Sequence, residues 1–262
     1  MTTSAQPDLA RIPAGDFLMG TADANEDERP VHRVLLGEYF IGRFPVTNDE
    51  YACFVRATGY PVPSIGELPL VAAGDRGARF RELAAAYVWN GPVAPAGRGS
   101  HPVVLVRYED AVAYCDWLSD AIGRRVRLPT EAEWEKAARG GAEGLRYPWG
   151  DEISATRANY LPDAASKMQR GTRPTGTYEP NAYGVYDMIG NVWEWVSDWY
   201  GADYYAGADS DNPRGPSSGN TRIVRGGSWV NDDVSMLRCA YRHRVPPDTY
   251  AHSIGFRIVC AP

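Results

Sequence analysis

Residues 190–200 read GNVWEWVSDWY and place three tryptophans within seven positions of an acidic chain. If the stretch is extended, its side chains alternate between two faces. Trp193, Trp195 and Trp199 then share one face, whereas Glu194 and Asp198 lie on the other. The first face predicts a packed aromatic wall. The second carries carboxylates that need water, a partner or a cation.

The composition limits the classes of protein that this chain can represent. Its 262 residues allow one large, loop-rich domain, and 27 glycines and 20 prolines predict many turns. The net charge is −6 and no basic run stands out, which argues against binding nucleic acid or an anionic membrane. We expect a monomer whose partner is a peptide or a small molecule.

The N-terminus and the cysteines indicate a location. The first residues, MTTSAQPDLARIP, lack the apolar core of a signal peptide, and no stretch has the length of a membrane span. The four cysteines are widely spaced without a CxxC pattern, so they predict neither a disulfide framework nor a zinc site. We expect a cytoplasmic protein.

Three stretches carry helix signals. A helix over 48–58 is predicted between a Thr47 or Asn48 cap and Gly59. The apolar spacing of YEDAVAYCDWLSDAI predicts a helix over 108–122 that stops at Gly123. Thr130 and Glu133 form a capping box for a third helix that Gly140 ends.

The other segments predict short strands and loops. Residues 1–10 are expected to be a disordered tail, 11–262 a single domain, and 60–100 a long surface excursion. Two short strands are expected around Gly37, and HPVVLV at 101–106 is expected to be a short buried strand. The sum is an α+β fold in which two main helices, 108–122 and 131–139, lie beside a small, mostly antiparallel sheet, with little regular structure elsewhere.

In order along the chain, these segments resemble the formylglycine-generating enzyme family, also called the sulfatase-modifying factor domain. The resemblance runs from about residue 11 to residue 258 and implies a variant of the C-type-lectin fold. It is specific for the fold and less so for activity, because one fold hosts oxidases and binding proteins. The matching segments are FLMG at 17–20, DERPVHRV at 27–34, PVTNDEY at 45–51, RLPTEAEWEKAARGG at 127–141, YPWGD at 147–151, NAYGVYDMIGNVWEW at 181–195, RIVRGGSW at 222–229 and IGFR at 254–257.

The resemblance implies a structural calcium ion at DMIGNVWEW. Asp187 and Glu194 would supply side-chain oxygens, and Gly190 and Val192 would supply backbone carbonyls, a mixture that suits a hard cation. In the alternative interpretation, Glu194 pairs with an arginine and Asp187 caps a turn. We expect Arg225, Arg238 and Arg257 to pair with acids, and Asp187, Asp198 and Asp248 are the candidates.

A second calcium site of the family matches Asn159 and the carbonyl of Tyr160. The segment that should bring further ligands is shorter here. Lys167 falls where an acid is expected, and Asp163 is the substitute.

Catalysis in this family uses two cysteines, five residues apart, that bind copper(I) and oxidise a substrate cysteine with oxygen. The resemblance places Cys239 at the second cysteine, whereas Val234 stands five residues before it and cannot bind a metal. Cys260 is the remaining candidate for a second thiolate. Cys239 is either a thiolate favoured by neighbouring arginines or a small buried residue without chemistry.

Two classes of function stay open. The first is an oxygen-dependent oxidoreductase acting on a peptide or small thiol, with Cys239 as the catalytic residue and copper(I) as a candidate cofactor. The second is a catalytically inert ligand-binding protein, since the C-terminal segment also resembles C-type-lectin-fold proteins diversified by retroelements. Trp229 is expected at the mouth of a cleft. The full set of candidate substrate-binding residues is Ser228, Trp229, Tyr241, His243 and His252.

Overall fold

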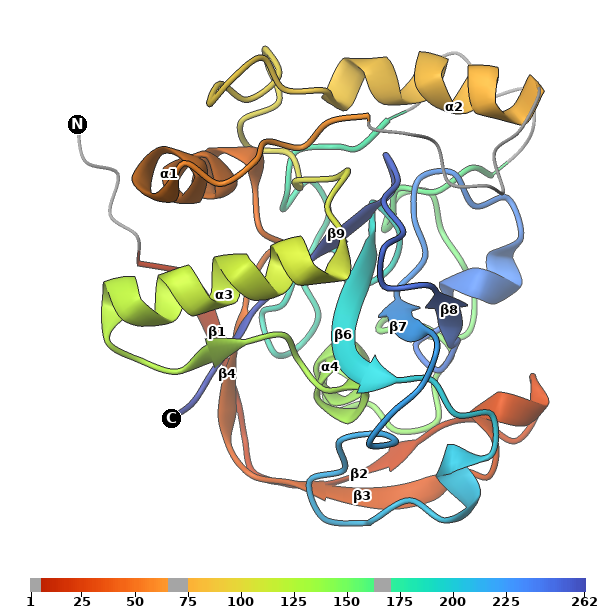
Figure 1. The fold of residues 1–262 in the computed structure, drawn as a ribbon. Helices are drawn as coiled ribbons and strands as arrows, with labels where there is room; N and C mark the ends of the chain where they lie inside the picture. Colours follow the sequence, from red (N-terminus) through yellow and green to blue (C-terminus); the bar gives the residue numbers. More distant parts are fainter. Residues whose placement is uncertain (1–5, 66–74, 163–170) are drawn as a thin grey trace.

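The computed structural model describes residues 6–65, 75–162 and 171–262, and they form an α+β fold with short elements and long fixed loops (Figure 1). The helices are α1 (Asn48–Thr58), α2 (Asp75–Ala84), α3 (Tyr108–Ile122) and α4 (Glu131–Arg139), and the 3-10 turns are η1 (Glu26–Glu28), η3 (Ala85–Tyr87), η5 (Tyr204–Ala206) and η6 (Val234–Leu237). The strands are β1 (Leu9–Ile12), β2 (Gly15–Met19), β3 (His32–Leu36), β4 (Tyr39–Gly42), β5 (Val126–Arg127), β6 (Trp193–Trp199), β7 (Arg222–Arg225), β8 (His243–Val245), β9 (Ile254–Phe256) and β10 (Val259–Cys260).

Three sheets organise these strands. One has the order β1-β4-β10-β5, another pairs β2 with β3, and the third has the order β8-β7-β6-β9. The pairings are antiparallel except for β6 with β9, which run parallel from Trp193 opposite Ile254 to Trp195 opposite Phe256. The C-terminal strands therefore join two sheets, because β9 extends the third sheet and β10 enters the first.

Helix ends follow the predicted caps. The Thr47 and Thr130 side chains accept from the backbone N–H of Glu50 and Glu133, three residues on, and these glutamates return the bond to the cap residue. Gly59, Gly123 and Gly140 end their helices in the left-handed conformation. The predicted bounds of α1, α3 and α4 are confirmed.

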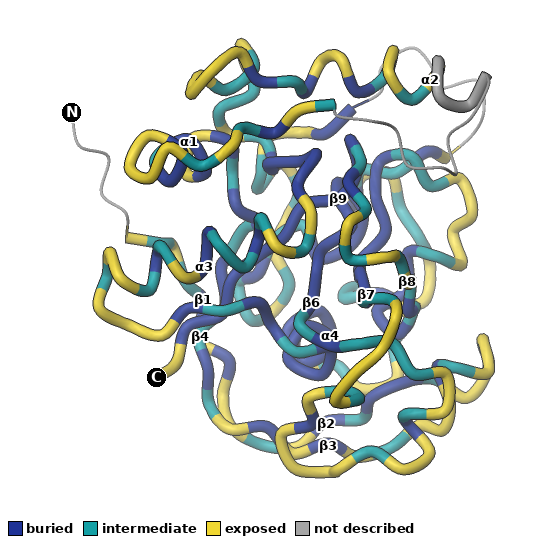
Figure 2. Tube along the Cα trace, viewed as in Figure 1, coloured by how far each residue is buried: buried dark blue, intermediate teal, exposed yellow. Residues whose placement is uncertain are grey.

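Strand β6 lies at the centre of the fold with the predicted alternation (Figure 1). Trp193 and Trp195 pack in one hydrophobic cluster with α1 and α3, whereas Val196 packs in another with α4. Figure 2 shows that β6, β7 and α4 are buried together, while loop tips and the outer turns of α1 and α3 are exposed. The aromatic face of the opening motif is therefore core at Trp193 and Trp195, whereas Trp199, beyond a register shift in β6, is partly buried with the Arg222 guanidinium 3.5 Å from its ring centre.

Three expectations about local structure were wrong. Residues 60–100 contain α2 and η3. Residues 103–106 are buried but form no strand, because Leu105 adopts a positive φ of 62° that breaks an extended run. Residues 9 and 10, placed in the tail, pair with Gly42 and Ile41 in β4, whereas residues 1–5 lie outside the described residues. In the described part of the chain, no helix is long and apolar enough to cross a membrane.

Candidate functional site

Glu194 on β6 is held by an arginine. Its Oε2 accepts hydrogen bonds from Trp134 Nε1 at 2.7 Å and Arg257 Nε at 2.6 Å, and its Oε1 accepts one from Arg257 Nη2 at 2.7 Å. Both partners of the ion pair are buried. The carboxylate placed among tryptophans is thus neutralised by the guanidinium from the IGFR motif, as in the alternative interpretation.

The other residues of the first predicted calcium site lie in the loop before β6. Asp187 Oδ2 accepts the backbone N–H of Gly176 at 2.8 Å. Burial raises the pKa of Asp187 to about 6, and Glu194 adds to the rise while the Gly176 hydrogen bond and Arg257 oppose it. Gly190 N–H donates to the carbonyl of Gly226 at 2.8 Å, and Val192 is buried.

These residues lie together but do not fit the implied ligand set, because both Glu194 oxygens are engaged by Arg257 and Trp134. An ion pair of this kind supplies the countercharge that a cation would supply. We therefore derive nothing from a bound calcium.

The residues of the second predicted calcium site adjoin the first. Asn159 forms an isolated bridge with Gly190, and its Nδ2 donates to the carbonyl of Gly171 at 3.0 Å and to Asn191 Oδ1 at 3.2 Å. Tyr160 is partly buried and packs against the first core cluster. Asp163 and Lys167 lie outside the described residues, so this second site stays a prediction.

Cys239 is a buried thiol, 1% exposed. Burial raises its pKa to about 12, and the lowering by Arg139 and Arg225 does not offset this. The arginines beside it in sequence point elsewhere, since Arg238 pairs with Glu28 and Arg242 with Glu131. This environment supports the interpretation of Cys239 as an inert packing residue.

The cysteines do not fit a two-thiolate copper site. Cys239 packs in one core cluster, whereas Cys260 packs in the other. Cys260 lies close to Cys115 and contributes to raising the pKa of the Cys115 thiol. Val234 is 41% exposed on η6 and offers no ligand. Within the described residues, no three His, Cys, Asp or Glu side chains converge as a metal site would require.

Three of the predicted substrate-binding residues are buried. Trp229 is only 3% exposed, and its Nε1 donates to the carbonyl of His252 at 3.2 Å, so the expectation that it lies at the mouth of a cleft was wrong. Ser228 Oγ donates to Asn231 Oδ1 at 2.8 Å. Burial lowers the pKa of His252 to about 4, and its ring stacks on Phe80 at 5.4 Å between centroids.

Tyr241 and His243 are half-buried on the C-terminal segment. The His243 ring stacks on Trp193 at 4.9 Å between centroids, and Tyr241 lies 6.0 Å from Trp193. Of the five predicted residues, these two are the ones that share a partly accessible aromatic face.

A cleft of about 520 Å³ opens beside Arg238 and Ala240. Its remaining lining comes from two loops and the end of α4, namely Leu18, Gly20, Thr21, Ala22, Asp23, Val31, Arg139, Gly144, Leu145, Arg146, Asp151 and Glu152. Arg139 and Arg238 are neutralised by Glu135 and Glu28, and Arg146 pairs with Asp23 at the exposed rim. Among the described residues, Asp151 and Glu152 are exposed lining carboxylates that form no ion pair, although Asp151 contributes to raising the pKa of Arg146. Three of the four exposed charges at the rim, Asp23, Asp151 and Glu152, are therefore acidic.

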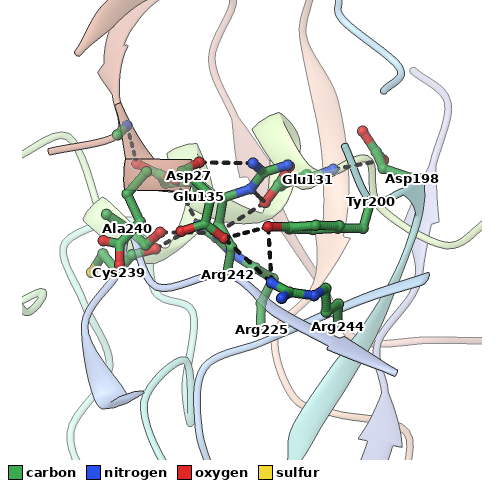
Figure 3. A network of polar contacts seen from close by, with 12 residues as sticks. Asp27, Glu131, Glu135, Asp198, Tyr200, Arg225, Cys239, Ala240, Arg242 and Arg244 are labelled. Carbon is green, nitrogen blue, oxygen red and sulfur yellow. Dashed lines mark hydrogen bonds and ion pairs between the residues drawn. The ribbon is translucent and has the colours of Figure 1, made fainter. Parts of the chain in front are cut away.

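A buried network fixes one wall of this cleft (Figure 3). Arg225 donates to Glu131 Oε1 at 3.0 Å and to Glu135 Oε2 at 2.6 Å, and to the carbonyls of Cys239 and Ala240. Arg242 donates to both oxygens of Glu131. Arg225 and Arg242 therefore connect the C-terminal segment to Glu131 and Glu135 of α4.

The aspartates predicted as arginine partners were wrong. Arg225 pairs with Glu131 and Glu135, Arg238 with Glu28, and Arg257 with Glu194. Asp198 instead accepts the N–H of Glu131 at 2.9 Å, where it faces the N-terminus of α4. The sequence did contain a signal for these ion pairs: Glu131, Glu135 and Arg139 are spaced four residues apart and so lie on one face of α4.

Comparison with known proteins defines the class. The sequence profile described as "Sulfatase-modifying factor enzyme 1-like domain" matches residues 1–262. The chain is 36% identical to a formylglycine-generating enzyme of Thermomonospora curvata, over 97% of this chain and 93% of that protein. It therefore belongs to the sulfatase-modifying factor family.

The family is diverse in the names that its members carry. The chain is 39% identical to a serine/threonine-protein kinase pkn1 of Chlamydia pneumoniae, over 95% of this chain, but it spans only 37% of that protein. An inactive Cα-formylglycine-generating enzyme 2 of Bos taurus is 35% identical, over 95% of this chain and 86% of that protein.

Solved structures give the same assignment. The structure of PvdO from Pseudomonas aeruginosa is 32% identical with a TM-score of 0.81, over 99% of this chain and 96% of that chain. Treponema denticola variable protein 1 is 26% identical with a TM-score of 0.74, over 97% of this chain and 95% of that chain.

Proposed function

We propose that this protein binds a peptide or small-molecule ligand in the 520 Å³ cleft and does not oxidise a substrate thiol through Cys239. The observation that carries the proposal is the burial of Cys239, whose pKa is raised to about 12. A buried thiol with a raised pKa is a poor nucleophile near neutral pH. The backbone of Cys239 nevertheless accepts from Arg225, so the residue helps to hold the cleft wall.

The charge of the cleft favours a cationic ligand. Its buried arginines are paired internally, which leaves the carboxylates of Asp151 and Glu152 at the rim. A ligand that carries an ammonium or guanidinium group would meet these carboxylates at a partly screened surface.

Saturation-transfer NMR with two tripeptide mixtures, one cationic and one anionic, tests this proposal. We expect signals from the cationic mixture, and we expect Ala22→Trp to abolish them, because Ala22 is an exposed residue that lines the cleft. Asp203→Asn, which removes an exposed carboxylate outside the lining, should leave them unchanged. Equal signals from wild type and Ala22→Trp would contradict binding in this cleft.

An oxygen-dependent oxidoreductase is the second candidate. It is supported by 36% identity to a formylglycine-generating enzyme over most of both chains. Oxygen uptake with a cysteine-containing peptide, measured with and without added copper(I), separates the two candidates. Uptake that Cys239→Ser abolishes would establish the oxidoreductase. The absence of uptake and of tight copper(I) binding would favour the binding protein.

The aromatic face of Trp193, Tyr241 and His243 is a second candidate surface for binding. Tyr241 and His243 come from the C-terminal segment that resembles diversified binding proteins, whereas Trp193 comes from β6. The 26% identity to a protein named a variable protein supports this class. Loss of ligand signals in His243→Ala, but not in Ala22→Trp, would assign binding to this face instead of the cleft.

A further inference from the structure

A second cavity, of about 260 Å³, shares no lining residue with the 520 Å³ cleft and lies next to Asn159, whose Nδ2 donates to the carbonyl of its lining residue Gly171. Two loops far apart in the sequence form it. The lining residues are Ala96, Gly97, Arg98, His101, Gly171, Thr172 and Arg173. Among the described lining residues, the titratable ones are thus two arginines and a histidine, and none is a carboxylate.

The two loops are joined by the Thr172 side chain. Its Oγ1 accepts from Arg98 Nη1 at 3.3 Å and lies 2.9 Å from His101 Nδ1. The donor in the contact between Oγ1 and Nδ1 depends on the tautomer of His101. In the tautomer in which the hydroxyl donates to Nδ1, the proton of the neutral imidazole lies on Nε2. His101 can then donate from Nε2 to a ligand in the cavity.

The positions of the basic groups are fixed in advance. The Arg98 guanidinium lies 4.4 Å above the centre of the Tyr87 ring, and Tyr87 Oη accepts the N–H of Thr172 at 3.0 Å. Asn48 Nδ2 donates to the carbonyls of Arg98 and His101 from beneath the first loop. Groups held this way lose little conformational entropy when a ligand binds.

The second loop is fixed by a reciprocal amide contact. The backbone N–H of Arg173 donates to Asn191 Oδ1 at 2.9 Å, and Asn191 Nδ2 donates to the carbonyl of Arg173 at 3.3 Å. The backbone of Arg173 is therefore anchored, while its side chain is exposed at the cavity.

The positive charge in this cavity is not balanced within the described part of the chain. No described carboxylate forms an ion pair with Arg98 or Arg173, although Asp49 packs against nearby Gly99. Both arginines contribute to lowering the pKa of His101, after the larger effect of burial, so the three groups lie close together. In a protein of net charge −6, this concentration of positive charge is local.

We propose that this cavity binds a dianionic phosphate group through Arg98, Arg173 and His101. Guanidinium groups match the tetrahedral oxygens of phosphate with charge-assisted hydrogen bonds, and two of them balance a dianion. The cavity has room for a phosphate and for a small group attached to it. The ligand is therefore free phosphate or a small phosphomonoester.

Isothermal titration calorimetry at constant ionic strength tests the site, with inorganic phosphate, phosphoserine and acetate as probes. We expect both phosphate compounds to bind and acetate to bind at least about tenfold more weakly, since a monoanion forms fewer charge-assisted bonds. Tighter binding of phosphoserine would identify a phosphomonoester, and equal binding would identify free phosphate. Acetate that binds as tightly as phosphate would overturn the proposal.

Three glutamine variants assign the site. Arg173→Gln and Arg98→Gln should each weaken phosphate binding about tenfold, the change expected for one lost charge-assisted hydrogen bond. Arg214→Gln removes an exposed positive charge outside the cavity and should change nothing. Because the Arg173 side chain is exposed, its variant should fold normally even if Arg98→Gln does not. Phosphate binding unaffected by Arg173→Gln, or weakened equally by Arg214→Gln, would refute the proposal.

Discussion

Replacing Arg257 by glutamine should lower the free energy of unfolding by about 3–5 kcal/mol, the usual cost of leaving one member of a buried ion pair alone. Arg257 donates twice to Glu194, and also to the carbonyls of Gly42 at 2.8 Å and Tyr186 at 2.9 Å. Glutamine cannot reproduce this set. Glu194 would keep Trp134 as its donor but would stay buried without its countercharge.

Urea unfolding followed by tryptophan fluorescence measures this cost. Glu194→Gln should be similarly destabilising, and the double variant should be much less destabilised than the sum, since it leaves no unpaired charge. Arg11→Gln is the matched control. It breaks an exposed pair with Glu38, in which the side chains are 66% and 31% exposed, and should leave the free energy of unfolding nearly unchanged.

The same experiment distinguishes arginine from calcium as the group that neutralises Glu194. With arginine in this role, EDTA has the same effect on the urea midpoint of the wild type as on that of Glu194→Gln. If EDTA lowers the midpoint of the wild type but not that of Glu194→Gln, or if Arg257→Gln costs less than about 1 kcal/mol, then calcium and not Arg257 neutralises Glu194.

Three further predictions concern other positions. Burial raises the folded-state pKa of Asp198 to about 7, above its ordinary value of 3.8, so ionisation of Asp198 destabilises the fold as the pH rises from about 4 to about 7. In urea unfolding, Asp198→Asn should therefore be more stable relative to wild type at pH 8 than at pH 4, and a pH-independent difference would contradict this. Gly190→Ala should lower the free energy of unfolding by about 3 kcal/mol, because the added Cβ would overlap the Asn159 carbonyl. Gly144 has a similar positive φ but open space around it, so Gly144→Ala should lower the free energy of unfolding by about 1 kcal/mol in the same assay. In mass-spectrometric alkylation of the native protein at pH 8, Cys53 should react and Cys239 should not, until urea exposes it; rapid native labelling of Cys239 would contradict its burial.

Local signals in the sequence were sufficient for most elements. Thr130 and Gly140 marked both ends of α4, and strict alternation assigned Trp193 and Trp195 to one face of β6. Helix α2 was missed because its segment, DRGARFRELA, is polar, has a glycine near its start and shows little apolar periodicity. The segment 101–106 has the composition of a strand, but its backbone direction is set by the neighbours it packs against.

The candidate site was harder to predict because it depends on pairings between distant residues. A buried arginine needs an acidic partner, but the sequence does not show which acid it is. Glu28, the partner of Arg238, lies 210 positions away in the sequence. The exposure of Trp229 and Cys239 likewise depends on segments that pack over them in three dimensions. The sequence therefore indicated which residue types the candidate site contains, but neither the ion-pair partners of its arginines nor the solvent exposure of its side chains.

The buried arginines explain why a fold with so few long strands can hold a defined C-terminal segment. Residues 238–242 lack strand partners in the described structure, so their carbonyls and charges need other partners. Arg225 supplies donors to the carbonyls of Cys239 and Ala240, while Arg238 and Arg242 anchor the segment to Glu28 and Glu131. The segment around Cys239 consequently has a structural role in this chain whether or not the thiol reacts. A family match at this segment therefore does not imply catalysis, which depends on thiol exposure and on metal ligands.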